Sequence, residues 1–290
     1  MEKKLVSRVS AVGIGGNVTL SVFKFLAGLI GNSSAMVSDA VHSLSDVLAT
    51  LIALIGVKVS KKGADAGHPY GHDRFECISS EILAGVLFLT GAGIGAAGIE
   101  TILAGNYEEL AVPGLLPLVA AVVSIVSKEA MFWYTRGCAK KLNSSAFMAD
   151  AWHHRSDAFS SIGSLIGIAG ARAGFPVLDP IASVVICIFI LKVAVDIFRD
   201  ATRKLTDTAC DEEYNEQVRE FIEKQEGVKR IDLLQTRMFG EKVYIDVEIA
   251  ADAHLELQSA HQIAERVHDG LEQNFDNIKH VMVHVNPYES

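Results

Sequence analysis

The sequence predicts a two-part membrane protein, with six transmembrane helices in residues 1–204 and a small ferredoxin-like α+β domain in residues 205–290. Half of the 290 residues are hydrophobic and the mean hydropathy is +0.29, which is too apolar for an ordinary soluble enzyme of this length. The acidic residues behind the net charge of -9 concentrate after Asp207. This asymmetry indicates two parts in different solvent environments.

Six apolar runs are long enough to cross a bilayer, which takes about 20 residues of helix. Several of them contain glycine, which allows close contact between membrane helices. The N-terminus lacks the small-residue cleavage site of a signal peptide, so we expect the first run to be retained as a helix. The runs lie near residues 9–30, 35–57, 79–103, 112–135, 146–171 and 178–198.

The basic residues that flank these runs predict the orientation, because cytoplasmic loops carry an excess of Lys and Arg. The opposite side has only Arg172, together with the acidic Glu108 and Glu109. We therefore expect both termini in the cytoplasm and the protein in the plasma or inner membrane. The basic residues on the cytoplasmic side are Lys3, Lys4, Arg8, Lys58, Lys61, Lys62, Arg74, Arg136, Lys140, Lys141, Arg199, Arg203 and Lys204.

A motif repeated in the second and fifth runs supplies the candidate functional residues. Asn32–Asp46 and Asn143–Asp157 both begin N-S-S-A and end D-A-x-H-x-x-S-D. Each copy places a His four residues before an Asp, and such residues lie on one helix face. The two helices are expected to run in opposite directions, with both pairs near the middle of the bilayer. Two facing pairs supply the four N/O ligands of a tetrahedral metal site, and inverted repeats of this kind are typical of secondary transporters.

These features together resemble the cation diffusion facilitator family, which exchanges divalent metal ions for protons. The resemblance covers nearly the whole chain and implies a homodimer through the C-terminal domain. It assigns the transport site to His42, Asp46, His153 and Asp157. Two His with two Asp suit zinc, with cadmium, cobalt or iron as competitors, whereas manganese-type members tend to use carboxylates in both motifs. We therefore expect proton-coupled export of cytosolic Zn²⁺ by alternating access, with no enzymatic activity and no nucleic-acid partner.

Several alternatives to this interpretation stay open. The same fold would serve a carrier chiefly of Fe²⁺, Mn²⁺ or Cd²⁺, a metal-sensing membrane protein without turnover, or a channel. The His–Asp pairs would, on a purely structural interpretation, only join helices. Asp39 and Asp150 share the faces of the ligand pairs and would relay protons, support the imidazoles by hydrogen bonds or line a wet vestibule. Arg155 is expected to pair with an acid or face a wet cavity, and His154 to be a neighbour of the site.

The resemblance implies a metal site in the loop after residue 60 and an ion pair between the end of this loop and the residues after the sixth run. Asp65, His68 and His72 match a D-x-x-H-x-x-x-H loop that binds metal in the family. Three N/O ligands leave room for water in such a site, although the loop's conformation alone would also explain these residues. Arg74 and Asp207 are expected to form an interlock near the membrane surface, with a contribution of about 0–1 kcal/mol if the pair is exposed.

The C-terminal residues predict an α-β-β-α-β order with helices on one face of a sheet. The elements are expected at Glu212–Gln225, Val228–Met238, Lys242–Ala250, Leu257–Phe275 and Lys279–Asn286. The expected core faces are Val243, Ile245, Val247 and Ile249 on a strand, and Leu257, Ala260, Ile263, Ala264, Val267 and Leu271 on a helix.

A regulatory zinc site in this domain is implied by the resemblance. Asp232, Asp246, His261 and His284 occupy the matching positions, although His-rich members have His at the first two and Asp where Asn286 stands. On the alternative interpretation, the histidines are solvated residues of a small acidic domain.

Overall fold

The computed structural model describes residues 2–60, 62–105, 110–142, 145–240 and 242–289. Within these ranges, side chains are described except those of residues 2–10, 49, 50, 52–58, 60, 142, 145–147, 149 and 150. The contacts divide the chain into two compact units. One comprises Met1–Ile52 and Ile82–Asp196, and the other Ala53–Glu81 and Ile197–Ser290.

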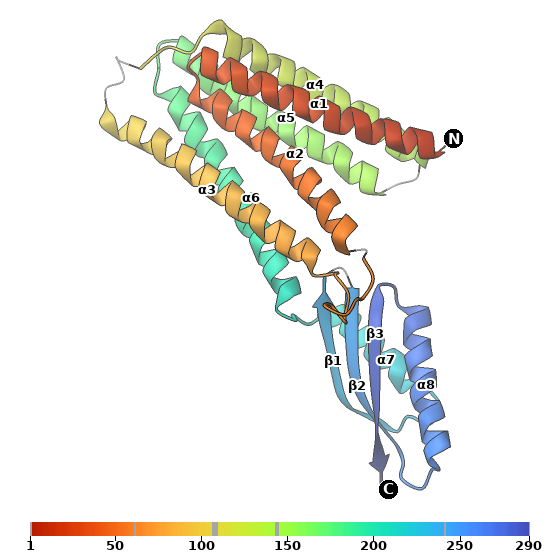
Figure 1. Cartoon of the computed structure of the whole chain (residues 1–290). Helices are drawn as coiled ribbons and strands as arrows, with labels where there is room; N and C mark the ends of the chain where they lie inside the picture. Colours follow the sequence, from red (N-terminus) through yellow and green to blue (C-terminus); the bar gives the residue numbers. More distant parts are fainter. Residues whose placement is uncertain (1, 61, 106–109, 143–144, 241, 290) are drawn as a thin grey trace. The chain divides into compact units, whose positions relative to one another are not determined.

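Six long helices precede the C-terminal domain (Figure 1). Most extend several residues beyond the predicted apolar runs, because Lys, Arg and Glu at the flanks are good helix formers. The fourth begins at Leu115 rather than directly after Pro113. The helices are α1 (Glu2–Ile30), α2 (Ser34–Ser60), α3 (Phe75–Ala104), α4 (Leu115–Leu142), α5 (Ser145–Arg172) and α6 (Leu178–Leu205).

Four segments in the described part of the chain are long and apolar enough to cross a membrane: Ala11–Ile30, Phe75–Ala104, Leu115–Lys141 and Leu178–Leu205. Helices α2 and α5, which carry the repeated motif, are not among them. The six-span topology and the boundary at residue 204 therefore stay predictions.

The helical unit buries several charged side chains and exposes many large apolar ones. Lys24, Lys128, Asp39 and Asp157 are buried among the helices, whereas large apolar side chains such as Leu89 and Val126 are exposed. This distribution fits a lipid environment, where ionisable groups face the interior of the bundle.

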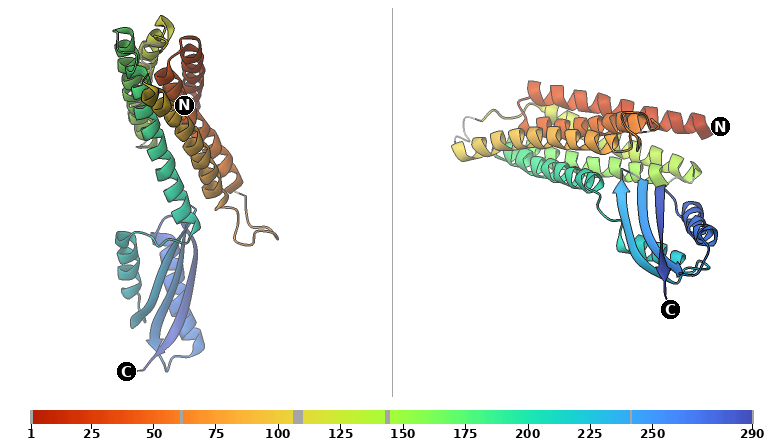
Figure 2. Two further views of the ribbon diagram at one scale, coloured as in Figure 1. Left: turned by 90° about the vertical axis from the view of Figure 1, so that its left-hand side faces the viewer. Right: turned by 60° about the horizontal axis from the view of Figure 1, so that its bottom comes forward.

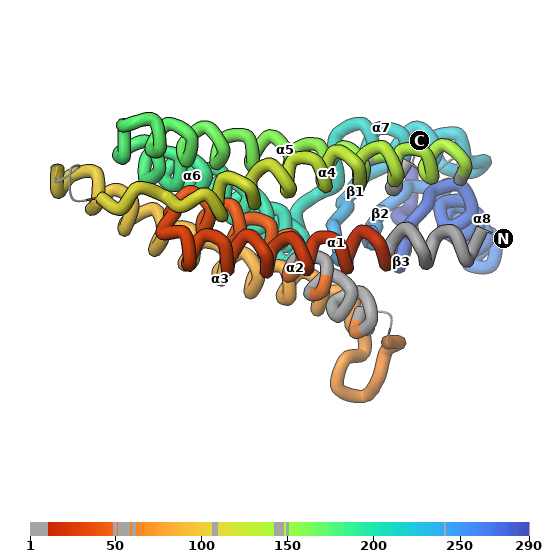
Figure 3. Tube along the Cα trace, turned by 90° about the horizontal axis from the view of Figure 1, so that it is seen from above, coloured from red at the N-terminus to blue at the C-terminus, as the bar shows by residue number. Residues whose placement is uncertain are grey.

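Small residues bring the helices that carry the motif close to their neighbours. A Cβ added to Gly167 of α5 would lie 2.3 Å from the Cβ of Ala182 on α6, so the two backbones approach closely there. Helix α4 packs along α5 and also contacts α1. The tube view shows α1 and α4 running side by side (Figure 3).

The start of α2 is completed by a residue from α6. The carboxylate of Asp179 accepts hydrogen bonds from Ser33 Oγ at 2.5 Å, from Ser34 N at 2.6 Å and Ser34 Oγ at 2.7 Å, and from Ala35 N at 3.2 Å. A carboxylate at a helix N-terminus satisfies free N–H groups and favours the helix dipole. Asp179 therefore fixes the end of α2 from which His42 and Asp46 follow.

The C-terminal domain has the predicted α-β-β-α-β order. Its elements are α7 (Glu212–Glu223), β1 (Arg230–Phe239), β2 (Lys242–Asp252), α8 (Leu257–Asn274) and β3 (Ile278–Tyr288). The strands lie in the order β1-β2-β3, with β1 and β2 antiparallel and β2 and β3 parallel. Two further views show the three strands side by side (Figure 2). This arrangement confirms the ferredoxin-like prediction.

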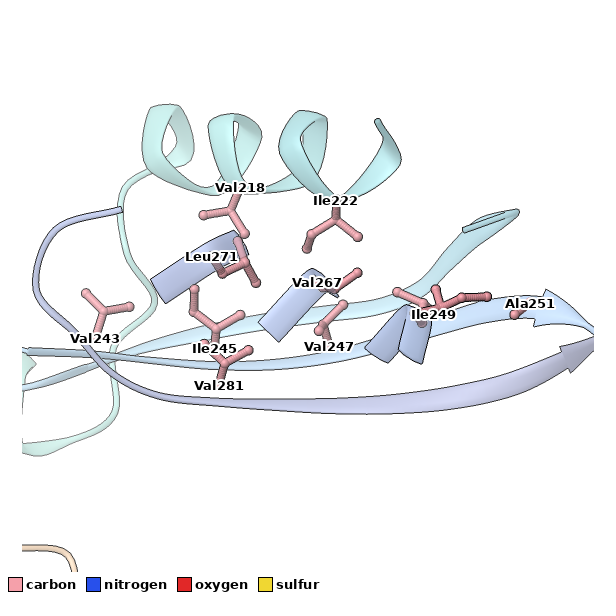
Figure 4. Close-up of a cluster of buried hydrophobic side chains, with 11 residues drawn as sticks. Val218, Ile222, Val243, Ile245, Val247, Ile249, Ala251, Val267, Leu271 and Val281 are labelled. Atoms are coloured by element: carbon pink, nitrogen blue, oxygen red, sulfur yellow. The ribbon is translucent and has the colours of Figure 1, made fainter. Parts of the chain in front are cut away.

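One hydrophobic core joins both helices to one face of this sheet (Figure 4). Val243, Ile245, Val247 and Ile249 are buried on the predicted face of β2. The stripe predicted for α8 is confirmed at Ile263, Val267 and Leu271 and wrong at Leu257, which is 86% exposed. Leu257 is the first residue of α8, and it lies at the rim of a pocket that Ala260, His261 and residues of β3 also line.

Candidate metal centre

The repeated motif of α2 and α5 forms one cluster of ligand atoms. Atoms of His42, Asp46 and Asp157 that could bind a metal all lie within 4.8 Å of one another. His153 Nε2 lies 3.9 Å from Asp46 Oδ1 and 3.9 Å from Asp157 Oδ1. The structure thus brings together all four residues that the sequence nominates, and the helical spacing places each His one turn before its Asp.

The cluster is buried at one end and open at the other. The side chain of Asp157 is 3% exposed, whereas that of His153 is 49% exposed. A cavity of about 310 Å³ lies beside His42, between α5 and α6. Its lining combines hydroxyl groups with apolar side chains: Ser156, Phe159, Ser160, Gly163, Val185, Ile186, Phe189 and Val193. A small ion therefore has space to approach the imidazole of His42.

A buried lysine that the sequence analysis missed lies against this cluster. Lys128 of α4 is fully buried, and its Nζ donates to Asp157 Oδ2 at 2.5 Å and to Asn17 Oδ1 at 2.7 Å. The signal was present in the sequence, because an ionisable residue inside an apolar helix is costly and marks a functional position. The predicted orientation rests only on basic residues that flank the apolar runs, and Lys128 lies inside one of these runs.

A second buried ion pair holds Asp39. Lys24 Nζ lies 2.8 Å from Asp39 Oδ2, and this carboxylate also accepts from Ser160 and Ser161 of α5. Asp39 is therefore buried and paired with a lysine of α1. The side chain of its counterpart Asp150 lies outside the described residues.

The two residues that follow His153 have structural partners. His154 is buried. Arg155 lies 3.5 Å from a carboxylate oxygen of Glu129 and 4.6 Å above the ring of Phe132. Of the two expectations for Arg155, the structure shows the pair with an acid.

Two protein-family models match the chain along most of its length. Residues 10–206 match the model of the cation efflux transmembrane domain, and residues 210–288 match that of the cation efflux protein cytoplasmic domain. The chain belongs to the cation diffusion facilitator family. This cation efflux protein is therefore an integral membrane transporter of divalent metal ions, and it is not an enzyme.

Individual relatives of the cation efflux protein span almost the whole chain. An uncharacterized transporter of Methanocaldococcus jannaschii is 33% identical, over 98% of this chain and 98% of its own length. The manganese efflux system protein MneP of Bacillus subtilis is 32% identical, over 99% of this chain and 98% of its own. Metal tolerance protein C1 of Arabidopsis thaliana is 32% identical over 97% of this chain, which spans 62% of that longer protein.

The loop of the cation efflux protein gathers its three predicted ligands. Ligand atoms of Asp65, His68 and His72 lie within 4.8 Å of one another. The backbone N–H groups of Gly67 and His68 donate to Asp65 Oδ1, and Lys62 donates to its Oδ2. The hydrogen bond from Lys62, followed by that from the backbone of His68, holds the pKa of Asp65 well below its usual range. The carboxylate is thus ionised and oriented beside two imidazoles.

The residues proposed for a metal site in the C-terminal domain do not gather in the same way. Asp232 accepts hydrogen bonds from Arg230 and Asn286, and the first of these lowers its pKa most. His284 pairs in register with Glu248, on the sheet face away from the helices. His261 projects from α8, where it lies 3.3 Å from Glu265. The sheet therefore separates His261 from the ligands predicted on the strands.

The interlock predicted between Arg74 and Asp207 is present as an ion pair. Arg237 approaches the same carboxylate at 3.7 Å, and the Arg74 guanidinium lies 4.5 Å from the ring centre of Phe239. The loop segment and the first strand of the C-terminal domain are thus joined within one unit.

Proposed function

We propose that this cation efflux protein exports Zn²⁺ from the cytosol in exchange for protons, at His42, Asp46, His153 and Asp157. The observation that carries the proposal is the cluster itself, which combines two imidazoles and two carboxylates from two helices. Two nitrogen and two oxygen ligands suit the tetrahedral coordination of zinc.

Proton exchange follows from the chemistry of these ligands. A metal ion binds neutral imidazole and ionised carboxylate, so binding displaces protons and protonation favours release. Histidine changes charge within the physiological pH range, which suits it to this exchange. Zinc would enter the cluster from the cytosol, α1, α2, α4 and α5 would rock against the other helices, and protons would replace the ion on the far side.

Manganese is a second candidate substrate. A relative of this chain over nearly its full length is named as a manganese efflux system protein. Carboxylate and water ligands suit Mn²⁺, whereas imidazole suits zinc, iron and copper. The two histidines of the cluster favour zinc, and the relative's name favours manganese.

The C-terminal domain and the loop would support transport from the cytosolic side. The domain matches a family model of cytoplasmic dimerisation domains, and we expect a homodimer joined through it. Asp65, His68 and His72 would bind a further ion at the membrane surface, with lower affinity because two of these side chains are well exposed.

Flux into proteoliposomes tests the proposal. Purified protein is reconstituted in vesicles that contain a metal-sensitive dye, and uptake of Zn²⁺, Mn²⁺, Fe²⁺ and Cd²⁺ is measured with and without a pH gradient. We expect saturable zinc uptake that rises when the lumen is more acidic than the outside, and that alkalinises the lumen as metal enters, because protons leave in exchange. Zinc uptake independent of the gradient would refute antiport, and faster uptake of manganese than of zinc would select the second candidate.

A further inference from the structure

The two carboxylate oxygens of Asp157 have different partners, and one of these partners is Lys128. Oδ2 accepts the hydrogen bond from Lys128 Nζ at 2.5 Å, whereas Oδ1 faces His153 Nε2 at 3.9 Å. The lysine is 0% exposed, so water does not screen its charge. Only the carboxylate of Asp157 therefore separates the ammonium of Lys128 from the position proposed for the metal ion.

The same lysine has a second acceptor within reach. Asn17 Oδ1 lies 2.7 Å from Lys128 Nζ. Asn17 and Lys128 are separated by the same number of residues as His42 and His153, so they occupy equivalent positions of the two repeats. One half of the site thus has a neutral amide where the other half has a cation, and the two side chains meet.

We propose that Lys128 is a tethered competitor for the divalent ion, which neutralises Asp157 in the metal-free site and shifts toward Asn17 when the ion binds. The inference rests on the proposed function, because it assumes that Asp157 is a metal ligand. Lys128 touches a ligand and not the ion, so it acts as a positioning residue.

The physical reason is repulsion between two cations that share one carboxylate. Charges a few ångströms apart in a poorly screened interior interact strongly. The ammonium therefore weakens metal binding and favours release. A carrier must bind its ion and also release it, and an ion held too tightly does not leave the transport site. The same holds for selective pores, where binding must be weak enough to permit exit.

A purely structural role makes a different prediction. If Lys128 only joined α4 to α5, its removal would leave Asp157 unpaired, loosen the bundle and weaken metal binding. The two roles therefore predict opposite changes in the dissociation constant.

Three single variants of the full-length protein separate them. Lys128→Gln removes the charge but keeps an N–H donor for Asp157. Asn17→Leu removes the alternative acceptor and leaves the ammonium on Asp157. The matched control is Lys24→Gln, which neutralises another buried lysine whose carboxylate partner, Asp39, lies outside the cluster of metal ligands. The Zn²⁺ and Mn²⁺ dissociation constants are measured by calorimetry in detergent, and kcat and KM are measured by proteoliposome flux.

We expect Lys128→Gln to bind both ions at least about tenfold more tightly, with KM and kcat both reduced. Asn17→Leu should bind them more weakly, and Lys24→Gln should not bind them more tightly than the wild type, since it removes a buried charge that does not touch a metal ligand. Weaker or unchanged binding in Lys128→Gln, or equal tightening in Lys24→Gln, would overturn the inference. If Lys128→Gln does not yield monodisperse protein, Asn17→Leu decides, since unchanged binding there also overturns it. Wild-type protein that binds neither ion would instead refute the proposed function, and the inference with it.

Discussion

Lys24 and Asp39 form an ion pair in which about 1% of each side chain is exposed, with Nζ and Oδ2 2.8 Å apart. Ser43 and Ser161 also accept hydrogen bonds from the ammonium, each at 2.9 Å. The pair therefore connects α1, α2 and α5 inside the helical unit. Hydrogen bonds of this kind offset part of the cost of burying two charges.

Removing one member of this pair should destabilise the protein strongly. In Lys24→Met the carboxylate of Asp39 keeps its buried charge without a counter-ion, and such losses cost about 3–5 kcal/mol. The double variant Lys24→Met with Asp39→Leu should recover most of the stability, because both charges are gone. The measurement is the midpoint of thermal unfolding in detergent. A single variant that unfolds at the wild-type temperature would contradict the assignment of a buried, charged pair.

Neutralising either carboxylate of the candidate metal centre should abolish transport. Asp46→Asn and Asp157→Asn keep the side-chain shape and remove the negative charge that binds the ion. We expect zinc flux in proteoliposomes to fall by at least about a hundredfold, since each 1.4 kcal/mol of lost binding is tenfold. Asp200→Asn is the control, because this exposed carboxylate pairs only with Lys204 among the partners that the structure records for it. Flux that survives in both variants would remove these residues from the site.

The imidazole of His42 should set the preference among metal ions. His42→Asp replaces nitrogen by oxygen, and oxygen ligands favour Mn²⁺ over Zn²⁺ relative to imidazole. The ratio of manganese to zinc flux should therefore rise. Competition among zinc, manganese, iron and cadmium in one vesicle preparation measures this ratio. An unchanged ratio would show that selection takes place elsewhere on the transport path.

Alkaline pH should destabilise the C-terminal domain through Tyr214. Burial raises the pKa of Tyr214 to about 12, whereas an unfolded tyrosine ionises near pH 10. The unfolded state therefore loses this proton first, and stability declines as pH rises from about 10 to about 12. Tyr214→Phe should flatten that decline in the thermal midpoint of the full-length protein. An equally steep decline in the variant would assign it to other groups.

The elements that the sequence predicted best are those with a regular spacing of residue types. The alternation of Val243, Ile245, Val247 and Ile249 identified β2 and its buried face, and the four-residue spacing in α2 and α5 identified side chains that the structure brings together. Both spacings follow from the geometry of a single element, so they need no knowledge of its neighbours.

The contacts that the sequence did not predict depend on the packing of several elements. Lys128 and Lys24 reach carboxylates on other helices, and no spacing rule for one helix indicates such partners. His261 is separated from His284 by the sheet, which only the register of the strands reveals. Leu257 follows the helical period, but its place at the start of α8 leaves it exposed.

The hydrogen bonds from the start of α2 to Asp179 have a consequence for biosynthesis. Ser34 and its acceptor are 145 residues apart, so α2 leaves the ribosome long before α6. The first turn of α2 acquires its final acceptors only when α6 joins the other helices. A nascent chain that stops short of α6 therefore leaves the donors of Ser34 and Ala35 without that carboxylate.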